Sequence, residues 1–288
     1  MSGNTNSKEN KPKISFSWLA RCRWNVLDMI NIIGNGAVPT YLFCDIDMGW
    51  AEELRQKLMA SGKRVTVTAI LLKAIAIAQR THPASRSALL PWGRTVTFHD
   101  IVAGFTVERF VGTQPTVFFG AIDGPDRKPI DQIADELRQY AERGLDEVPH
   151  LDIQNRFQNM PWLFRRFILW LGQNYPMVRL QHMGATFGLS SLGKHGVKAV
   201  IPPCVSTSTF GVGEVEQRAV VKDGNVVVRP IMTLTLNFDH RLIDGAPAAR
   251  FLRDIKMLVE GGLEAHIKEE LMSAAAILET PRPAPTYS

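Results

Sequence analysis

Residues 231–252, IMTLTLNFDHRLIDGAPAARFL, constrain the fold more than any other part of the chain. The first half of this segment alternates apolar side chains with small or polar ones, which is the pattern of a β-strand with two unlike faces. The triplet Asp-His-Arg at 239–241 follows, and Asp244 and Gly245 precede apolar residues at helical spacing. We therefore expect a strand, a tight connection and a helix, with His240 where the strand ends.

A histidine in this position is well placed to act as a general base. The strand holds the backbone rigid, the connection opens the imidazole to a cleft, and histidine is the side chain whose ordinary pKa lies near neutral pH. A histidine at a strand end is, however, more often a polar loop residue without a catalytic role. Considered alone, His240 leaves both interpretations open.

The composition is that of an ordinary globular protein. The 288 residues fit one large domain or two small ones, and 45% of them are hydrophobic. The formal net charge of +5 comes from dispersed basic residues, without the basic runs or aromatic–basic motifs of nucleic-acid-binding proteins. We expect no nucleic-acid partner, although a basic rim that attracts a phosphate-bearing cofactor would also explain the charge.

The cysteines and the N-terminal residues indicate the class of protein. Cys22, Cys44 and Cys204 form no C-x-x-C pair, so the sequence predicts neither a metal site nor a disulfide framework. Residues 1–13 are polar and lack the apolar core of a signal peptide, and no run of about 18 apolar residues predicts a membrane span. We expect a cytoplasmic protein.

Hydrophobic periodicity predicts a single domain over residues 14–280, between disordered tails at 1–13 and 281–288. Helices are expected at 16–33, 49–60, 65–80, 129–143, 161–171 and 253–274. Strands are expected at 38–48, within 95–106, at 115–121 and at 205–215, and a hairpin at 215–238 around Asp223-Gly224.

Two segments resemble a known family. The string FDHRLIDGAPAARFL at 238–252 closely resembles the active-site segment of the dihydrolipoamide acyltransferases, the catalytic domain of 2-oxoacid dehydrogenase complexes. It is also similar to the H-x-x-x-D-G of chloramphenicol acetyltransferase and of peptide-synthetase condensation domains. GATFGLSSLGKHG at 184–196 resembles the family's G-T-F-T-I-S-x-L-G segment. The stretch FVGTQPTVFFGAI at 110–122 departs from the family's G-L-I-V-P-V-type strand.

The resemblance implies an α/β fold, namely a two-layer sandwich of the chloramphenicol acetyltransferase type, in which helices pack on a mixed β-sheet. It also implies a homotrimer, with each active site at a subunit boundary. His240 of one chain would act as the general base, and Ser190 of the next would donate a hydrogen bond to the oxyanion. Coenzyme A and the acyl acceptor would enter a channel from opposite ends.

The resemblance assigns further residues to the site. Ser191 and Gly193, which follow the oxyanion donor, are expected at the coenzyme A site. Asp244 is expected to pair with an arginine of the N-terminal helix, either Arg21 or Arg23, and to hold the loop in shape. The sequence does not decide between the two arginines.

A hydrolase triad of Ser190, His240 and Asp244 is a weaker interpretation. Such a triad would require a G-x-S-x-G nucleophile elbow, and the sequence GLSSL at 188–192 lacks the second glycine. Ser190 and Ser191 could also serve only in a turn before Gly193, as serine–glycine clusters commonly do. Direct acyl transfer requires no enzyme nucleophile, so none of the three cysteines is assigned a catalytic role.

The predicted helix at 161–171 has Leu163, Phe164 and Phe167 on one face and two arginines, Arg165 and Arg166, on the other. The simplest interpretation is that the apolar face packs on the domain or on a neighbouring subunit. The alternatives are a lid or docking helix for a hydrophobic acyl chain or a partner, and an interfacial membrane helix, which the short length disfavours.

Three functional hypotheses remain. The first is an acyltransferase that moves an acyl group between a coenzyme A thioester and a thiol, amine or hydroxyl acceptor. The second is a core component of a 2-oxoacid dehydrogenase-like complex that acts on a lipoyl group supplied in trans, because the sequence shows neither a lipoyl nor a peripheral-subunit-binding domain. The third is an inactive trimeric scaffold, which the presence of both His240 and Ser190 disfavours.

Overall fold

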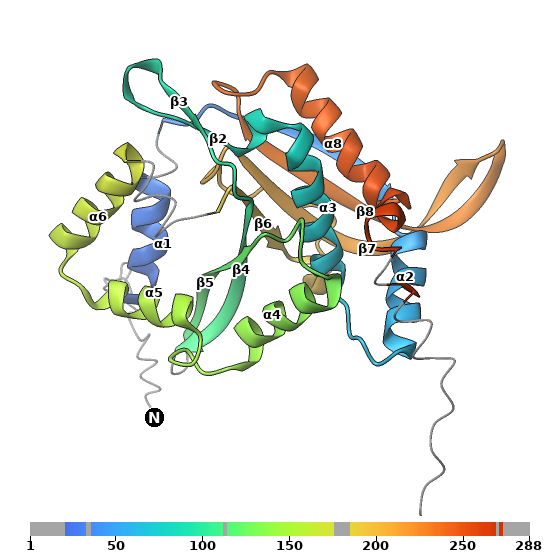
Figure 1. The fold of residues 1–288 in the computed structure, drawn as a ribbon, viewed down its shortest axis with the longest axis horizontal. Coiled ribbons are helices and arrows are strands. Elements are labelled where there is room, and N and C mark those ends of the chain that lie inside the picture. The colour runs from blue at the N-terminus through green and yellow to red at the C-terminus, as the bar shows by residue number, and fades with distance from the viewer. Residues whose placement is uncertain (1–20, 33–35, 112–113, 176–184, 269–270, 273–288) are drawn as a thin grey trace, which may run out of the picture.

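The computed structural model describes residues 21–32, 36–111, 114–175, 185–268 and 271–272. At its centre is a six-stranded mixed sheet with the order β1-β8-β7-β6-β4-β5 (Figure 1). Its strands are β1 (Pro39–Asp47), β4 (Val102–Val111), β5 (Gln114–Asp123), β6 (Phe187–Ser191), β7 (Ser208–Lys222) and β8 (Asn225–Asp239). The central β6 is parallel to both of its neighbours, and the remaining pairs are antiparallel. A small separate sheet pairs β2 (Ser87–Leu89) with β3 (Thr95–Thr97).

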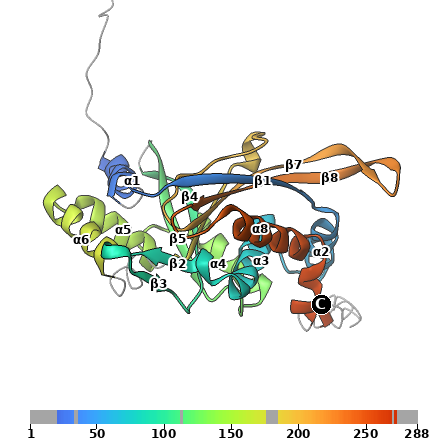
Figure 2. The same cartoon turned by 90° about the horizontal axis from the view of Figure 1, so that it is seen from above.

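The helices form two groups. They are α1 (Arg21–Ile32), α2 (Gly49–Ala60), α3 (Val67–Thr81), α4 (Ile130–Glu142), α5 (Pro149–Asn159), α6 (Trp162–Asn174) and α8 (Gly245–Val259). Figure 2 shows α2, α3, α4 and α8 on one side of the sheet, whereas α1, α5 and α6 gather at the end near β5. The sheet and the first group therefore form the two layers of an α/β sandwich.

Helix α3 is the centre of the helical layer. Thr66 caps its N-terminus by accepting a hydrogen bond from the backbone N of Ala69 at 3.2 Å. Every residue from 69 to 79 is buried, as the uninterrupted apolar sequence predicts. The helix ends at Thr81, before His82-Pro83, where proline cannot continue the hydrogen-bond pattern.

The two faces of β8 have different environments, as its alternating sequence predicts. Met232, Leu234 and Leu236 are fully buried on the side of the helices. On the other face, Asn237 donates a hydrogen bond from Nδ2 to the carbonyl of Pro202 at 2.7 Å, because residues 197–205 cross over this part of the sheet. A Cβ at Gly211 would lie 1.9 Å from the carbonyl oxygen of Val200, so only glycine allows this close crossing.

Most expected elements are present, and strands β2 and β6 are additional to those expected. The helix expected at 253–274 ends at Val259, because the chain reverses at Gly261 with a φ of 141°. Helix α5 was not expected from the sequence. Of the helix expected at 16–33, residues 21–32 are described and helical, and both expected tails lie outside the described residues.

Candidate active site

His240 lies directly after β8, on the connection to α8. Its backbone N donates to the carbonyl of Val38 at 2.9 Å, and its ring packs against Phe238 with the ring centroids 5.8 Å apart. The side chain remains 44% exposed, and its Nδ1 lies 3.9 Å from Oδ1 of Asp244. The backbone is thus fixed while the imidazole stays accessible, which is what a general base requires.

Asp239 stabilises this connection, a role that the sequence did not reveal. Its buried carboxylate accepts hydrogen bonds from Nη2 of Arg241 at 2.6 Å, from Nε of the same arginine at 2.9 Å and from the backbone N of Val38 at 3.2 Å. Burial raises the pKa of Asp239, but the hydrogen bonds from Arg241 outweigh this effect, and the pKa lies below its ordinary value. The carboxylate is therefore ionised at neutral pH and anchors the segment that carries His240.

Asp239→Asn is expected to lower the free energy of unfolding by about 2 kcal/mol at pH 7, because charged hydrogen bonds within a fixed pair are lost. The pKa of Asp239 is lower in the folded than in the unfolded chain, so its contribution is complete above the ordinary pKa of about 3.9 and disappears as the pH falls through the folded value. Urea unfolding of wild type and Asp239→Asn at pH 7 and pH 4 measures this contribution to the free energy of unfolding. If the stability difference between wild type and Asp239→Asn were larger at pH 4 than at pH 7, the stabilising role of the ionised Asp239 carboxylate would be contradicted.

Asp244 is the residue that the resemblance pairs with Arg21 or Arg23. It precedes α8 as its N-cap residue, and its side chain is 85% exposed. Within the described part of the chain, Arg23 is exposed and makes no ion pair with Asp244. The side chain of Arg21 lies outside the described residues, so a pair between Arg21 and Asp244 remains a prediction.

Ser190 lies near the end of β6, at the centre of the sheet. Its Oγ accepts a hydrogen bond from Oγ1 of Thr106 at 3.3 Å, which shows that the two side chains share one face of the sheet. Ser191 is exposed. Gly193 begins the following turn, where a Cβ would lie 2.6 Å from the carbonyl oxygen of Gly213. Close packing thus explains the glycine, and contact of Ser191 and Gly193 with coenzyme A remains a prediction.

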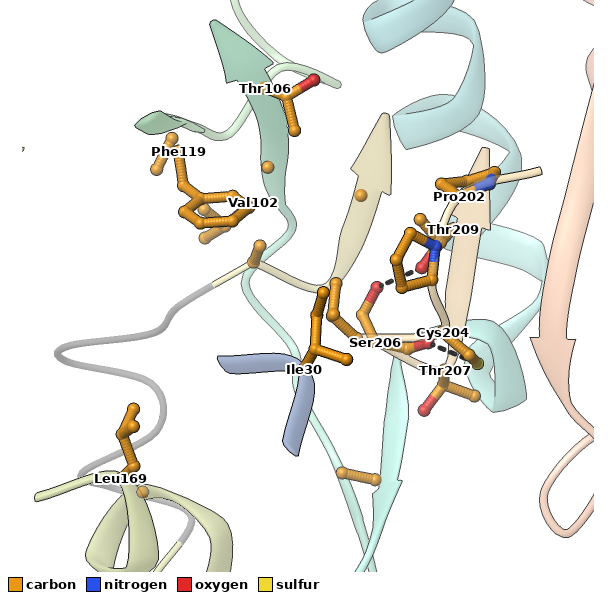
Figure 3. A pocket seen from close by; sticks show the side chains of 18 of the residues that line it. Ile30, Val102, Thr106, Phe119, Leu169, Pro202, Cys204, Ser206, Thr207 and Thr209 are labelled. Atoms are coloured by element: carbon orange, nitrogen blue, oxygen red, sulfur yellow. Dashed lines mark hydrogen bonds between the residues drawn. The ribbon is translucent and has the colours of Figure 1, made fainter. Parts of the chain in front are cut away.

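Ser190 borders a cavity of about 1590 Å³ on the face of the sheet that the main helical layer leaves uncovered (Figure 3). The cavity reaches Asp239 and Arg241, but His240 is not among its described lining residues. Its wall on the other side includes Cys204. Burial and, to a smaller extent, the charge of Asp239 raise the pKa of the Cys204 thiol to about 12. This thiol is protonated at neutral pH, and thiols in that form are not nucleophiles.

Ser190 and His240 do not meet within one chain. Ser190 pairs with Gly211, which pairs with Thr235, so these three residues are level across the sheet. His240 follows Thr235 by 240 − 235 = 5 residues, and therefore lies about 16 Å farther along the sheet and about 10 Å across it. Its ring also packs on Phe238, on the face opposite to Ser190.

A comparison with family models identifies the chain. The model of the 2-oxoacid dehydrogenases acyltransferase (catalytic domain) matches residues 29–151 and 177–267, which is most of the sequence. The chain belongs to this acyltransferase family. The predicted α/β sandwich of the family is likewise confirmed.

Curated relatives and solved structures agree with membership of the acyltransferase family. The dihydrolipoyllysine-residue acetyltransferase component of the pyruvate dehydrogenase complex of Staphylococcus aureus is 26% identical over 220 residues, which are 75% of this chain and 44% of that protein. The chain thus spans less than half the length of this relative. The dihydrolipoamide acetyltransferase of Azotobacter vinelandii has a TM-score of 0.69 at 24% identity, covering 93% of this chain and 98% of that one. A probable dihydrolipoamide acetyltransferase of Listeria monocytogenes has a TM-score of 0.64 at 19% identity, covering 86% and 95%.

One internal segment of the chain lies outside the family match. Residues 152–176 lie between the two matched segments and contain most of α5 and all of α6. Helix α6 has an unexpected orientation, because Leu163, Phe164 and Phe167 are more than half exposed whereas Arg165 is 5% exposed. These three side chains do not pack on their own domain, so of the two packing alternatives the one on a neighbouring subunit stays a prediction. Among the described residues, no helix is both long and apolar enough to cross a membrane.

Proposed function

We propose that the protein is a coenzyme A-dependent acyltransferase that moves an acyl group by direct transfer. Membership of the acyltransferase family supports the reaction class, and the placement of Ser190 at the edge of a large cavity carries the proposal for the site. In the Azotobacter vinelandii enzyme, a serine, a histidine and an asparagine have been investigated for roles in catalysis. We assign Ser190 and His240 the corresponding roles, with Asp244 in place of the asparagine.

The proposed reaction requires two contributions from the protein. His240 accepts the proton of the attacking thiol, hydroxyl or amine as that group bonds to the thioester carbonyl, and then returns the proton to the leaving thiolate. Ser190 donates a hydrogen bond to the oxyanion of the tetrahedral intermediate. A general base contributes about 10²–10⁴ in rate and an oxyanion donor about 10²–10³. No covalent enzyme intermediate is involved, in keeping with the high pKa of Cys204.

The proposed site forms between two copies of the chain. The roughly 16 Å between His240 and Ser190 along the sheet exceeds any hydrogen-bonded arrangement around one reacting carbonyl. A neighbouring copy in a closed homo-oligomer, for which we propose the trimer, would bring its own His240 to the cavity beside Ser190. Related catalytic domains assemble into the cubic core of the pyruvate dehydrogenase complex, which supports oligomer formation.

A second candidate is a core component of a 2-oxoacid dehydrogenase-like complex. The observation in its favour is that the curated relatives are dihydrolipoyllysine-residue acetyltransferases. In this case the acceptor or donor thiol would belong to a lipoyl group supplied in trans. The two candidates share the same chemistry at His240 and Ser190 and differ only in the second substrate.

A thiol-release assay, in which free coenzyme A is separated by chromatography and quantified, distinguishes these candidates. Purified protein receives acetyl-, propionyl- or longer acyl-coenzyme A, with dihydrolipoamide or with a panel of small amines and alcohols. Turnover on dihydrolipoamide that falls at least about 100-fold in His240→Ala supports the complex component. Turnover only on another acceptor, with the same fall in rate in His240→Ala, supports a free-standing acyltransferase. Equal rates for wild type and His240→Ala on every pair, with the oligomer intact, would refute both.

A further inference from the structure

The cavity beside Ser190 extends as a groove along the sheet. Side chains at alternate positions share a face, so Thr106, Gly104 and Val102 of β4 lie in line on the cavity side. Thr106 contacts Ser190, and Val102 lies four residues, or about 13 Å, farther along the strand. On the adjacent strand β5, Phe119 is opposite Thr106 and Ala121 is opposite Gly104. Most of these side chains are small. A Cβ at Gly104 would lie 2.6 Å from the Cβ of Ala185, so Ala185 covers Gly104 and forms the floor of the groove at this point.

The segment outside the family match supplies one wall of this groove. The side-chain amide of Gln154 on α5 pairs with the edge strand β5, where the backbone N of Phe119 donates to Oε1 at 3.0 Å and Nε2 donates to the carbonyl of Phe119. Helix α6 is fixed to α1 by the buried ion pair between Arg165 and Asp28, with Nε and Oδ2 3.0 Å apart. These contacts hold both helices against the groove.

The side chains on this wall are mainly apolar. Figure 3 shows Leu169 of α6 on the same side of the view as Val102 and Phe119, across from Pro202 and Cys204, and Ile30 of α1 between the two sides. Further apolar residues of the wall are Ile153, Phe157, Met160, Ile168 and Leu171. Three side chains that can carry a charge reach this part of the cavity. They are exposed and lie at its rim, namely Asp123, His150 and Arg156. An apolar ligand in the groove would therefore cover apolar side chains, of which Ile153 is 61% exposed and Met160 41% exposed.

We propose that this groove binds the acyl chain of the substrate, and that the substrate class is an apolar acyl group much longer than acetyl. The inference rests on the proposed acyl transfer, because Ser190 would hold the carbonyl oxygen at one end of the groove. An extended polypeptide covers about 3.5 Å for every three backbone bonds, so a groove of about 13 Å accommodates about 11 bonds, or an extended chain of roughly 12 carbons. The segment 110–122 departs from the family pattern, and its residues Val117, Phe119 and Ala121 on β5 line the groove. Residues of both unusual parts of the sequence therefore meet at this groove.

Binding without turnover tests the groove separately from catalysis. Titration calorimetry on full-length His240→Ala would compare acetyl-, butanoyl-, octanoyl- and decanoyl-coenzyme A. We expect the affinity to rise about threefold to fourfold for each added methylene until the groove is filled. Equal affinities for all four thioesters would overturn the proposal. The proposed acyl transfer is tested separately from the groove: it would be refuted if wild type and His240→Ala showed the same rates in the thiol-release assay.

A blocking variant locates the acyl chain. Ala121→Phe places a ring in the middle of the floor and should reduce the affinity for octanoyl-coenzyme A to that for acetyl-coenzyme A. Ala219→Phe introduces the same ring at an exposed position of the β7–β8 hairpin and should change neither affinity. Leu169→Ala lengthens the groove and should shift the preferred chain to a longer one, which provides a second test if Ala121→Phe does not fold. Unchanged chain-length preference in a folded Ala121→Phe or in Leu169→Ala would overturn the proposal.

Discussion

Equimolar mixing of His240→Ala and Ser190→Ala chains is expected to restore about one quarter of the wild-type activity, although each variant alone is nearly inactive. In a mixed oligomer, a site is intact when one chain supplies His240 and its neighbour supplies Ser190. With random assembly, the chance that a site has an intact His240 is about one half, and the chance that the neighbouring chain has an intact Ser190 is also about one half. About one quarter of the sites are therefore complete, whatever the number of subunits in the ring. Co-expression of the two variants, followed by the thiol-release assay, measures the recovered activity.

The physical reason is the position of the two residues on the sheet. Ser190 is level with Thr235, and His240 follows five residues later with its ring against Phe238 on the opposite face. Co-expression of His240→Ala with the double variant lacking both side chains is the control, because no composite site can then be complete. Mixed chains that remain as inactive as the single variants, in an oligomer of normal size, would show that each chain builds its own site.

Arg165→Met is expected to lower the free energy of unfolding by about 3–5 kcal/mol, because the substitution leaves a buried carboxylate without its partner. The side chains of Arg165 and Asp28 are 6% and 11% exposed, and Nε and Oδ2 lie 3.0 Å apart. The guanidinium also donates from Nη1 to the carbonyl of Gln158 at 3.2 Å and lies 5.8 Å from the ring centre of Trp24. Urea unfolding followed by tryptophan fluorescence measures the loss.

The adjacent arginine provides a matched control. Arg166 is exposed and lies 5.8 Å from the ring centre of Trp162, without a buried partner among the described contacts. Arg166→Met changes the same side chain one residue away and is expected to cost less than about 1 kcal/mol. Equal losses in the two variants would contradict a structural role for the pair of Arg165 and Asp28.

The sequence by itself determined the elements whose signals are local. The alternation in 231–238 indicated which side chains of β8 face the helices, and Met232, Leu234 and Leu236 are indeed buried. Asp223-Gly224 predicted the hairpin turn, and both residues have positive φ, 52° and 79°. The continuous apolar run of α3 predicted a buried helix. Each of these features depends on neighbours within a few residues, so the sequence pattern contains the necessary information.

Only the tertiary structure decided how distant residues combine. The pattern of α6 shows a helix with two unlike faces, but the buried face contains Arg165 because Asp28, 137 residues earlier in the chain, neutralises it there. The resemblance of two segments indicated Ser190 and His240, whereas the register of β6, β7 and β8 places them too far apart for one chain to use both. The groove beside Ser190 likewise depends on strand pairing and on the docking of α5 and α6, and neither interaction leaves a periodic signal in the sequence.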